Sequence, residues 1–393
     1  MPFSLHLLGL AVFAQGTSEF MLSGLGPEIA ADLGVSLSAA GALTSAFAVG
    51  MVVGAPLMAA LSLRWSRRTA LLVLLGVFLL VHVLAAVTGS FTVLLVCRVV
   101  GALANAGFLA VALTAATRMV APDAKGRATS ALLGGVTLAC VVGVPAGALL
   151  GQLWGWRAAF WAVALLSLPA FAGILHSVPA EVGDPCGAGV RHELRALRDG
   201  RLLLRLLLGA LVNGATFCTF TYLAPLVTQV TGFGEGWVPV VLALFGVGSF
   251  VGVAVGGRVA DRRPAALLLG GGAALFVGWV LFALLAARPA VALPLVLVQG
   301  ALSFAVGSTL ISQVLYAATG APTLAGAFAT AAFNVGAAVG PWAGGIALGA
   351  GLGFRSPLWV SALLVAFALV SAGVAGRLWR TRTGSDSTEV RSK

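Results

Sequence analysis

The chain has 393 residues, of which 60% are hydrophobic and only 9% are charged. Soluble domains average roughly 45–50% apolar and about 25% charged residues, so this composition excludes an ordinary soluble protein and indicates a membrane protein. The net charge of +11 would suggest nucleic-acid binding in a soluble protein, but this composition indicates a membrane protein. We expect no metal site, disulfide or cofactor, because the cysteines lack metal-ligand spacing: Cys97, Cys140, Cys186 and Cys218.

Twelve apolar stretches are each long enough to cross a bilayer. A hydrocarbon core about 30 Å thick needs about 20 apolar residues per helix. In chain order the predicted spans are 5–26, 39–61, 69–88, 91–119, 128–150, 157–178, 202–225, 237–257, 264–287, 290–318, 323–350 and 357–379. We expect the first to be a permanent helix rather than a signal peptide, because it has no basic start and no small-residue cleavage site.

The basic residues fall almost entirely on one side of these spans. Nineteen of the 23 Lys and Arg residues lie on one set of alternate loops, the C-terminal tail or the adjoining span ends. The other set of loops carries Arg157, Arg288 and Arg355, and Arg98 lies inside a span. The positive-inside rule then predicts an inner (plasma) membrane protein with both termini in the cytoplasm. The positive net charge is therefore explained by the orientation of the protein in the membrane, and we expect no nucleic-acid partner.

The chain repeats itself at a shift of 198 positions. This shift aligns Pro27 with Pro225, Gly50 with Gly248, Gly151 with Gly349, Arg157 with Arg355 and Trp161 with Trp359. We therefore predict two six-helix bundles, 1–185 and 202–380, a cytoplasmic linker at 186–201 and a disordered cytoplasmic tail at 381–393. Many secondary transporters are built from such related halves, with the substrate held between them near the midplane. The repeat favours transport.

Glycine and proline mark helices that pack closely. Gly50-x-x-x-Gly54 and its repeat Gly248-x-x-x-Gly252 place small residues on one helix face, which lets helix backbones approach. The fifth and eleventh spans also carry a proline between glycines, which kinks a helix while keeping one face smooth. A gating role and plain packing both stay open for these residues: Gly143, Pro145, Gly147, Gly340 and Pro341.

Two charged side chains lie well inside the predicted spans, Glu19 and Arg98. A charge at a helix centre costs about 2.5–3.5 kcal/mol on insertion scales, so it normally faces a protein interior or a water-filled cavity. Glu19 can reduce this cost by taking a proton, because desolvation favours the neutral carboxyl. We expect Glu19 to couple transport to protons, with Gln15 one turn earlier holding its carboxyl; the alternative is a solvated Glu19 near the outer interface.

Arg98 cannot neutralise itself by losing a proton. It is either a structural clamp or a partner of the proton site, and the sequence leaves both roles open. Asn105 lies two turns further on and continues a polar stripe along the fourth span. His82 stands alone in the third span, where we expect a tolerated interior residue rather than a proton relay.

The second half has no acidic residue inside its spans, and Phe217 stands at the position aligned with Glu19. Aromatic rings with a few neutral hydrogen-bonding groups suit a small, largely uncharged ligand. The candidate substrate-binding residues are Gln15 and Asn105 in the first half, and Asn213, Phe220, Tyr222, Gln299, Phe304 and Asn334 in the second.

The chain holds no signal for an ATP-driven machine or an enzyme. A phosphate-binding loop needs Gly-Lys-Ser/Thr, and the chain's lysines are Lys125, followed by Gly126, and the final Lys393. No soluble domain is large enough to hold an active site. We therefore expect transport driven by an ion or substrate gradient.

Three motifs carry a family resemblance. They are Gly16-Thr17-Ser18-Glu19-Phe20 with the segment 25–36, Arg98-Val99-Val100-Gly101, and the run from Gly143 to Gly151 followed by Gly155-Trp156-Arg157. Over nearly its full length the chain resembles the major facilitator superfamily, and within it the twelve-span drug:proton antiporters. The loop Leu63-Arg64-Trp65-Ser66-Arg67 lacks the acid and the glycine usual there, whereas its repeat keeps Asp261 before Arg262. We expect these two residues to carry more of the gate.

Within the antiporters, the first-helix and fifth-helix motifs are most similar to chloramphenicol-resistance exporters, with sugar-efflux proteins next. The resemblance implies a proton-coupled antiporter that exports a small neutral antibiotic, in the first place chloramphenicol, and acts as a monomer. Efflux of a sugar or another small metabolite is the alternative on the same scaffold. A membrane receptor or a channel is the alternative from a different class. A receptor would usually carry an added signalling domain, and a channel seldom needs two similar halves.

Overall fold

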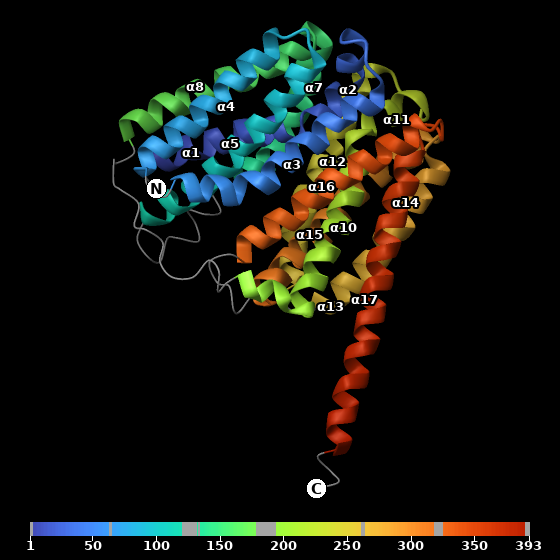
Figure 1. Ribbon diagram of the computed structural model, residues 1–393. Helices are drawn as coiled ribbons and strands as arrows, with labels where there is room; N and C mark the ends of the chain where they lie inside the picture. The colour runs from blue at the N-terminus through green and yellow to red at the C-terminus, as the bar shows by residue number, and fades with distance from the viewer. Residues whose placement is uncertain are drawn as a thin grey trace.

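The computed structural model describes residues 3–62, 65–119, 132, 134–177, 194–260, 264–317 and 325–389. The elements in this part of the chain are helices (Figure 1). Eleven of them are long and apolar enough to cross a membrane, and the pair α1 and α2, bent by 53°, makes a twelfth span. The predicted all-α, twelve-span architecture is confirmed.

The first half contains six spans. The first is the bent pair α1 (Phe3–Phe20) and α2 (Leu22–Asp32). The fifth span changes register, since a π-helical turn, η2 (Ala139–Gly143), precedes α7 (Val144–Trp154). The remaining spans are α3 (Leu37–Ser62), α4 (Arg67–Val87), α5 (Phe91–Arg118) and α8 (Trp156–Ser177).

The second half follows the same order. Short elements connect or extend its spans: η3 (Leu194–Arg198), α11 (Leu223–Gln229), η4 (Glu235–Trp237), α13 (Pro264–Ala266) and η5 (Leu267–Gly271). The long helices are α10 (Gly200–Thr221), α12 (Val238–Ala260), α14 (Gly272–Leu285), α15 (Pro289–Ala317), α16 (Ala325–Gly349) and α17 (Ser356–Glu389).

The C-terminal end differs from the expected tail. We expected disorder from residue 381, whereas α17 continues as helix to Glu389 and projects away from the bundle (Figure 1). The sequence from 380 to 389 contains no proline that would end a helix. The first half of the expected linker, 186–193, lies outside the described residues.

The repeat extends to the packing of the helices. In the first half, a Cβ added at Gly50 of α3 would lie 2.7 Å from the carbonyl oxygen of Val99 on α5. In the second half, one added at Gly248 of α12 would overlap the carbonyl oxygen of Leu297 on α15. Both contacts leave no room for a side chain, so these helices approach backbone to backbone. The expected packing role of the two glycine pairs is confirmed.

The two halves meet along α3 and α16. Ser38 Oγ donates to the carbonyl of Gly345 and Ser45 Oγ donates to the carbonyl of Ala338, each at 2.7 Å. Ser38 lies where α3 begins and Gly345 lies near the end of α16, and α2 and α11 also contact each other at this end of the molecule (Figure 1). We call it the closed end. Along the opposite seam, Gly246 of α12 packs on the backbone of Cys140 in η2.

Apolar side chains cover much of the outer surface. Leu80 is 65% exposed, Leu363 is 68% exposed and Phe367 is 58% exposed, and all three lie inside membrane spans. Many exposed large apolar side chains are costly in water but are normal where lipid chains are the solvent. The surface therefore agrees with the composition in indicating a bilayer protein.

Candidate functional site

Arg98 on α5 is bound to the backbone of α1. Its side chain is only 2% exposed. Nη1 donates to the carbonyl oxygen of Ser18 at 2.8 Å and to Ser18 Oγ at 3.0 Å, and Nη2 donates to the carbonyl oxygen of Glu19 at 3.4 Å. The guanidinium also lies over the Phe47 ring, 4.2 Å from its centroid. A charge that cannot be neutralised is thus compensated by carbonyl dipoles and by a π face.

Ser18 extends this group to α4. Its hydroxyl lies 2.6 Å from His82 Nε2, and His82 Nδ1 lies 2.7 Å from the carbonyl oxygen of Phe78. A carbonyl only accepts, so Nδ1 carries the imidazole hydrogen and Nε2 accepts from Ser18. His82 is interior, as expected, but it is fixed by two hydrogen bonds. Sequence reasoning gave Ser18 no role of its own, although it lies in the first-helix motif beside Glu19.

Glu19 itself keeps part of its surface exposed, in contrast to Arg98. It lies within electrostatic range of Arg98 and of Cys140 in η2. Gln15 is 1% exposed, and both atoms of its amide lack a hydrogen-bond partner in the described part of the chain. The expected hydrogen bond from Gln15 to the Glu19 carboxyl is therefore not formed in this conformation. Glu19 is left accessible, and a buried amide is left unpaired beside it.

A row of aromatic rings crosses from the first half to the second. Phe20 on α1 lies 5.6 Å from Phe217 on α10, and Phe217 lies 6.3 Å from Phe220. Phe220 continues to Phe245 on α12 at 4.7 Å, and Phe245 to Phe304 on α15 at 6.3 Å. The structure thus joins the candidates Phe220 and Phe304 through rings that sequence reasoning did not select. Phe20, next to Glu19, is the end of this aromatic row.

The asparagine candidates bind neighbouring helices or their own helix. Asn105 Nδ2 lies 3.5 Å from Met51 Sδ on α3, and Asn213 Nδ2 donates to the carbonyl of Phe333 on α16 at 2.7 Å. Asn334 Nδ2 donates to the carbonyl of Thr330 one turn earlier at 3.0 Å. Each amide keeps its side-chain oxygen for another partner, so a substrate role stays a prediction for them.

Gln299 and Tyr222 bond to backbone carbonyls of neighbouring helices. Gln299 is fully buried on α15 and donates through Nε2 to the carbonyl of Leu275 on α14 at 3.2 Å. Tyr222, 2% exposed, donates its hydroxyl to the carbonyl of Pro341 at 3.0 Å. It occupies the closed end, where an added Cβ at Gly345 would lie 2.6 Å from its hydroxyl oxygen. The geometry favours a structural bond for Gln299 and a gate contact for Tyr222.

The gating candidates of the fifth span face the first span. Gly143 packs on Thr17, and a Cβ added at Gly147 would lie 3.3 Å from the Cβ of Met21. Pro145 stands in the first turn of α7, directly after the π-helical turn. A π-helical turn inside an α-helix is rare and frequent at functional sites. The motif therefore joins the fifth span to the span that carries Glu19.

The second half uses the equivalent pair of helices. Gly340 on α16 packs on Gly214 of α10, where an added Cβ would lie 2.7 Å from the carbonyl carbon of Gly214. Pro341 follows and supplies the carbonyl that Tyr222 binds. The remaining gating candidates, Asp261 and Arg262, lie outside the described residues.

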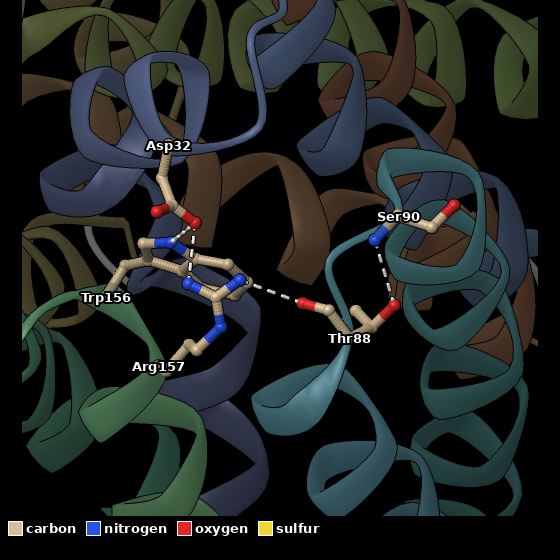
Figure 2. A network of polar contacts seen from close by, with 5 residues as sticks. All are labelled: Asp32, Thr88, Ser90, Trp156 and Arg157. Carbon is tan, nitrogen blue, oxygen red and sulfur yellow. Dashed lines mark hydrogen bonds and ion pairs between the residues drawn. The ribbon is translucent and has the colours of Figure 1, made fainter.

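A polar network joins the ends of several helices of the first half (Figure 2). Arg157 Nη1 forms an ion pair with Asp32 Oδ2 at 2.6 Å, and Trp156 Nε1 donates to the same oxygen at 3.1 Å. Arg157 Nη2 donates to the carbonyl of Thr88 at 3.0 Å, and the Ser90 amide donates to Thr88 Oγ1 at 3.1 Å. The network fastens α2, the α4–α5 connection and α8.

The second half does not repeat this network. At the shift of 198, Val230 replaces Asp32 and Phe354 replaces Trp156, so the acid and the indole donor are both missing. The two halves share a fold, but the second half lacks the acidic residue that pairs with the arginine in the first.

Comparison with known proteins agrees with the architecture. The family model described as "Major Facilitator Superfamily" matches residues 8–331. The chain is 56% identical over 391 residues, 99% of this chain and 100% of the relative, to a "Chloramphenicol resistance protein" of Streptomyces lividans. It is 35% identical to the "Inner membrane transport protein YdhP" of Escherichia coli K12, over 96% of this chain and 97% of that one.

Solved structures show the same fold. A bacterial homologue of the human lysosomal transporter Spinster, described as inward-facing and unoccupied, aligns with a TM-score of 0.77 at 18% identity, over 95% of this chain and 96% of that chain. The nucleoside transporter NupG aligns with a TM-score of 0.74 at 12% identity, over 94% and 98%. With its twelve-span helical fold and a family model matched across most of its length, this chain belongs to the Major Facilitator Superfamily of transporters.

Proposed function

We propose that the protein is a proton-coupled antiporter that exports a small neutral antibiotic, in the first place chloramphenicol, from the cytoplasm. The observation that carries this proposal is Glu19, a partly exposed carboxyl inside the first span whose neighbour Arg98 is bound to backbone carbonyls. A carboxyl in this setting can gain and lose a proton without breaking an ion pair. The 56% identical chloramphenicol resistance protein supports the choice of cargo.

The drug site in this proposal is the aromatic row with Gln15 at its edge. Ring pairs contribute about 0.5–1.5 kcal/mol each beyond the area that they bury. The Gln15 amide is unpaired and buried, which costs about 1–3 kcal/mol until a ligand or a water molecule bonds to it. A neutral aromatic drug with hydroxyl and amide groups meets both needs, because its ring stacks on Phe217 and Phe20 while its polar groups reach Gln15.

Coupling follows from competition between the drug and the proton. Drug binds from the cytoplasm when Glu19 is ionised, and protonation from outside favours its release. One proton moving down 100 mV supplies about 2.3 kcal/mol, and one pH unit adds about 1.4 kcal/mol. At one-to-one exchange the total supports a gradient of several hundredfold for a neutral drug.

The proposal also assigns an orientation. We place both termini in the cytoplasm, because the basic residues gather on that set of loops. The closed end then faces outside, and the conformation is inward-facing, like that of the Spinster homologue. We treat the single chain as the working unit, since one chain carries both the aromatic row and Glu19.

Drug accumulation tests the function. Wild-type cells should hold less chloramphenicol than cells without the protein, and an uncoupler should abolish the difference. Glu19→Gln should insert normally but lose efflux driven by a pH gradient. Glu235→Gln is the matched control, because it makes the same chemical change on an exposed side chain in η4. Efflux by E19Q at the wild-type rate would refute the coupling, and export of a sugar in place of the drug would refute the cargo.

A further inference from the structure

The group formed by Arg98, Ser18 and His82 links three helices at the point where Glu19 sits. Ser18 is fully buried, His82 is 4% exposed and Arg98 is 2% exposed. Their hydrogen bonds run from Arg98 on α5 to the Ser18 hydroxyl on α1 and on to His82 on α4. Exporting the drug, as proposed above, does not by itself require Ser18 or His82, so these bonds need a further explanation.

The directions of the bonds are fixed at both ends. At one end, the Phe78 carbonyl holds the hydrogen of His82 on Nδ1, so Nε2 has only a lone pair to offer. The single hydroxyl hydrogen of Ser18 therefore goes to Nε2. At the other end, the oxygen of Ser18 has its lone pairs free and receives Nη1 of Arg98. The bond from Arg98 to Ser18 Oγ therefore depends on the bond from Ser18 to His82, and that bond depends on the hydrogen of His82 staying on Nδ1.

The consequence for Arg98 is that its terminal nitrogens are occupied. Nη1 and Nη2 donate to Ser18 and to the backbone of Glu19, while Nε has no partner in the described part of the chain. The guanidinium is thus held beside Glu19 but aimed at carbonyl and hydroxyl oxygens. An ion pair between Arg98 and a free carboxylate would instead favour the charged form of Glu19 and oppose its protonation.

Resting on the proposed function, we propose that Ser18 and His82 are positioning residues that hold Arg98 on the α1 backbone and so keep the Glu19 carboxyl free to exchange its proton. The charged and titratable groups around Glu19 are Arg98 from α5 and Cys140 from η2, with His82 from α4 behind Ser18. Phe47 of α3 closes the remaining side of Arg98 with a ring. His82 acts here as a fixed neutral acceptor and carries no proton to Glu19.

The variants separate this role from simple packing. Ser18→Ala removes one of the two acceptors of Nη1, the hydroxyl oxygen, and leaves the Ser18 carbonyl in place. His82→Phe removes the acceptor that orients the Ser18 hydroxyl while keeping a ring between Phe78 and Phe160. Ser18→Thr retains the hydroxyl and should restore the wild-type behaviour. Ser167→Ala is the matched control, since Ser167 is also fully buried in the first half but bonds only the carbonyl of Val163 in its own helix.

The test measures protonation of Glu19 directly. Infrared titration of the purified protein in lipid follows the carboxyl band that is absent in Glu19→Gln. In S18A and H82F, Arg98 turns toward the carboxylate, and the midpoint of that band should move to more acidic pH by about one unit, a roughly tenfold loss of proton affinity. Drug–proton exchange in vesicles should show the same displacement of its pH profile, whereas S18T and S167A should keep the wild-type midpoint.

Two outcomes are distinguished by the paired measurements. If S18A and H82F lower the exchange rate equally at every pH and leave the infrared midpoint unchanged, the residues are merely structural and the inference is overturned. If wild-type protein moves the drug without any proton, the proposed function fails, and the infrared midpoints of the same variants still decide whether Ser18 and His82 position Arg98.

Discussion

The contact between α16 and α10 offers the sharpest test of the helix packing. Gly340 lies so close to α10 that an added Cβ would approach three backbone atoms of Gly214, with the carbonyl carbon at 2.7 Å and Cα at 2.9 Å. None of these atoms belongs to a side chain that could rotate away. Gly340→Ala must therefore push the two helices apart along their whole contact.

The expected cost follows from overpacking. Inserting a methyl group into a filled interior costs about 1–3 kcal/mol. For a unit of 150–250 residues, close to the size of one half, each kcal/mol lowers the melting temperature by about 2–4 °C. G340A should therefore melt about 2–12 °C below the wild type in detergent, as followed by loss of the monodisperse peak after heating.

Gly326→Ala supplies the control on the same helix. An added Cβ at Gly326 meets nothing within 4 Å, so the substitution gains about 0.5–1 kcal/mol of helix preference without a clash. Its melting temperature should equal or slightly exceed that of the wild type. If G340A were as stable as G326A, the close approach of α16 and α10 would be refuted.

The other predictions concern the closed end, the drug site and the first-half network. Ser38→Ala combined with Ser45→Ala removes two of the hydrogen bonds between the halves, each worth about 0.5–1.5 kcal/mol; spin labels across the closed end should show more of the open state, and an unchanged distance distribution would contradict this. Phe217→Ala should weaken drug binding about 2–12-fold by calorimetry, as expected for one lost ring pair, and wild-type affinity would remove Phe217 from the drug site. Asp32→Asn breaks an ion pair whose side chains are 46% and 35% exposed, so it should cost only about 0.2–1 kcal/mol; a larger fall in thermal stability would show that the network stabilises more than its exposure suggests.

The sequence predicted the large features because they depend on composition and period. Twelve apolar stretches, alternating basic loops and a repeat at one constant shift are sufficient for a twelve-span fold in two halves, and the structure has that fold. The glycine pairs were also predictable, since a residue without a side chain in a long helix usually marks a close neighbour, as at Gly50 and Gly248.

The polar interior was harder to predict, because side-chain direction depends on packing. Gln15 lies one turn from Glu19, which made a hydrogen bond between them reasonable, yet its amide stays unpaired. Tyr222 and Gln299 have the chemistry of substrate contacts but bond to backbone carbonyls of neighbouring helices. Ser18 lies in the first-helix motif, but its bonds could be found only from its distances to Arg98 and His82.

The unequal halves have a consequence for how this protein can change. Phe217 occupies the place that Glu19 has in the other copy, and Val230 the place of Asp32, so the two copies differ at these acidic positions. If the aromatic row binds the drug and Glu19 couples to protons, as proposed, substitutions in the row from α10 onward alter the drug site without touching the acid or the buried arginine. Under that proposal, a new resistance spectrum can evolve in the C-terminal copy while proton coupling stays intact in the N-terminal one.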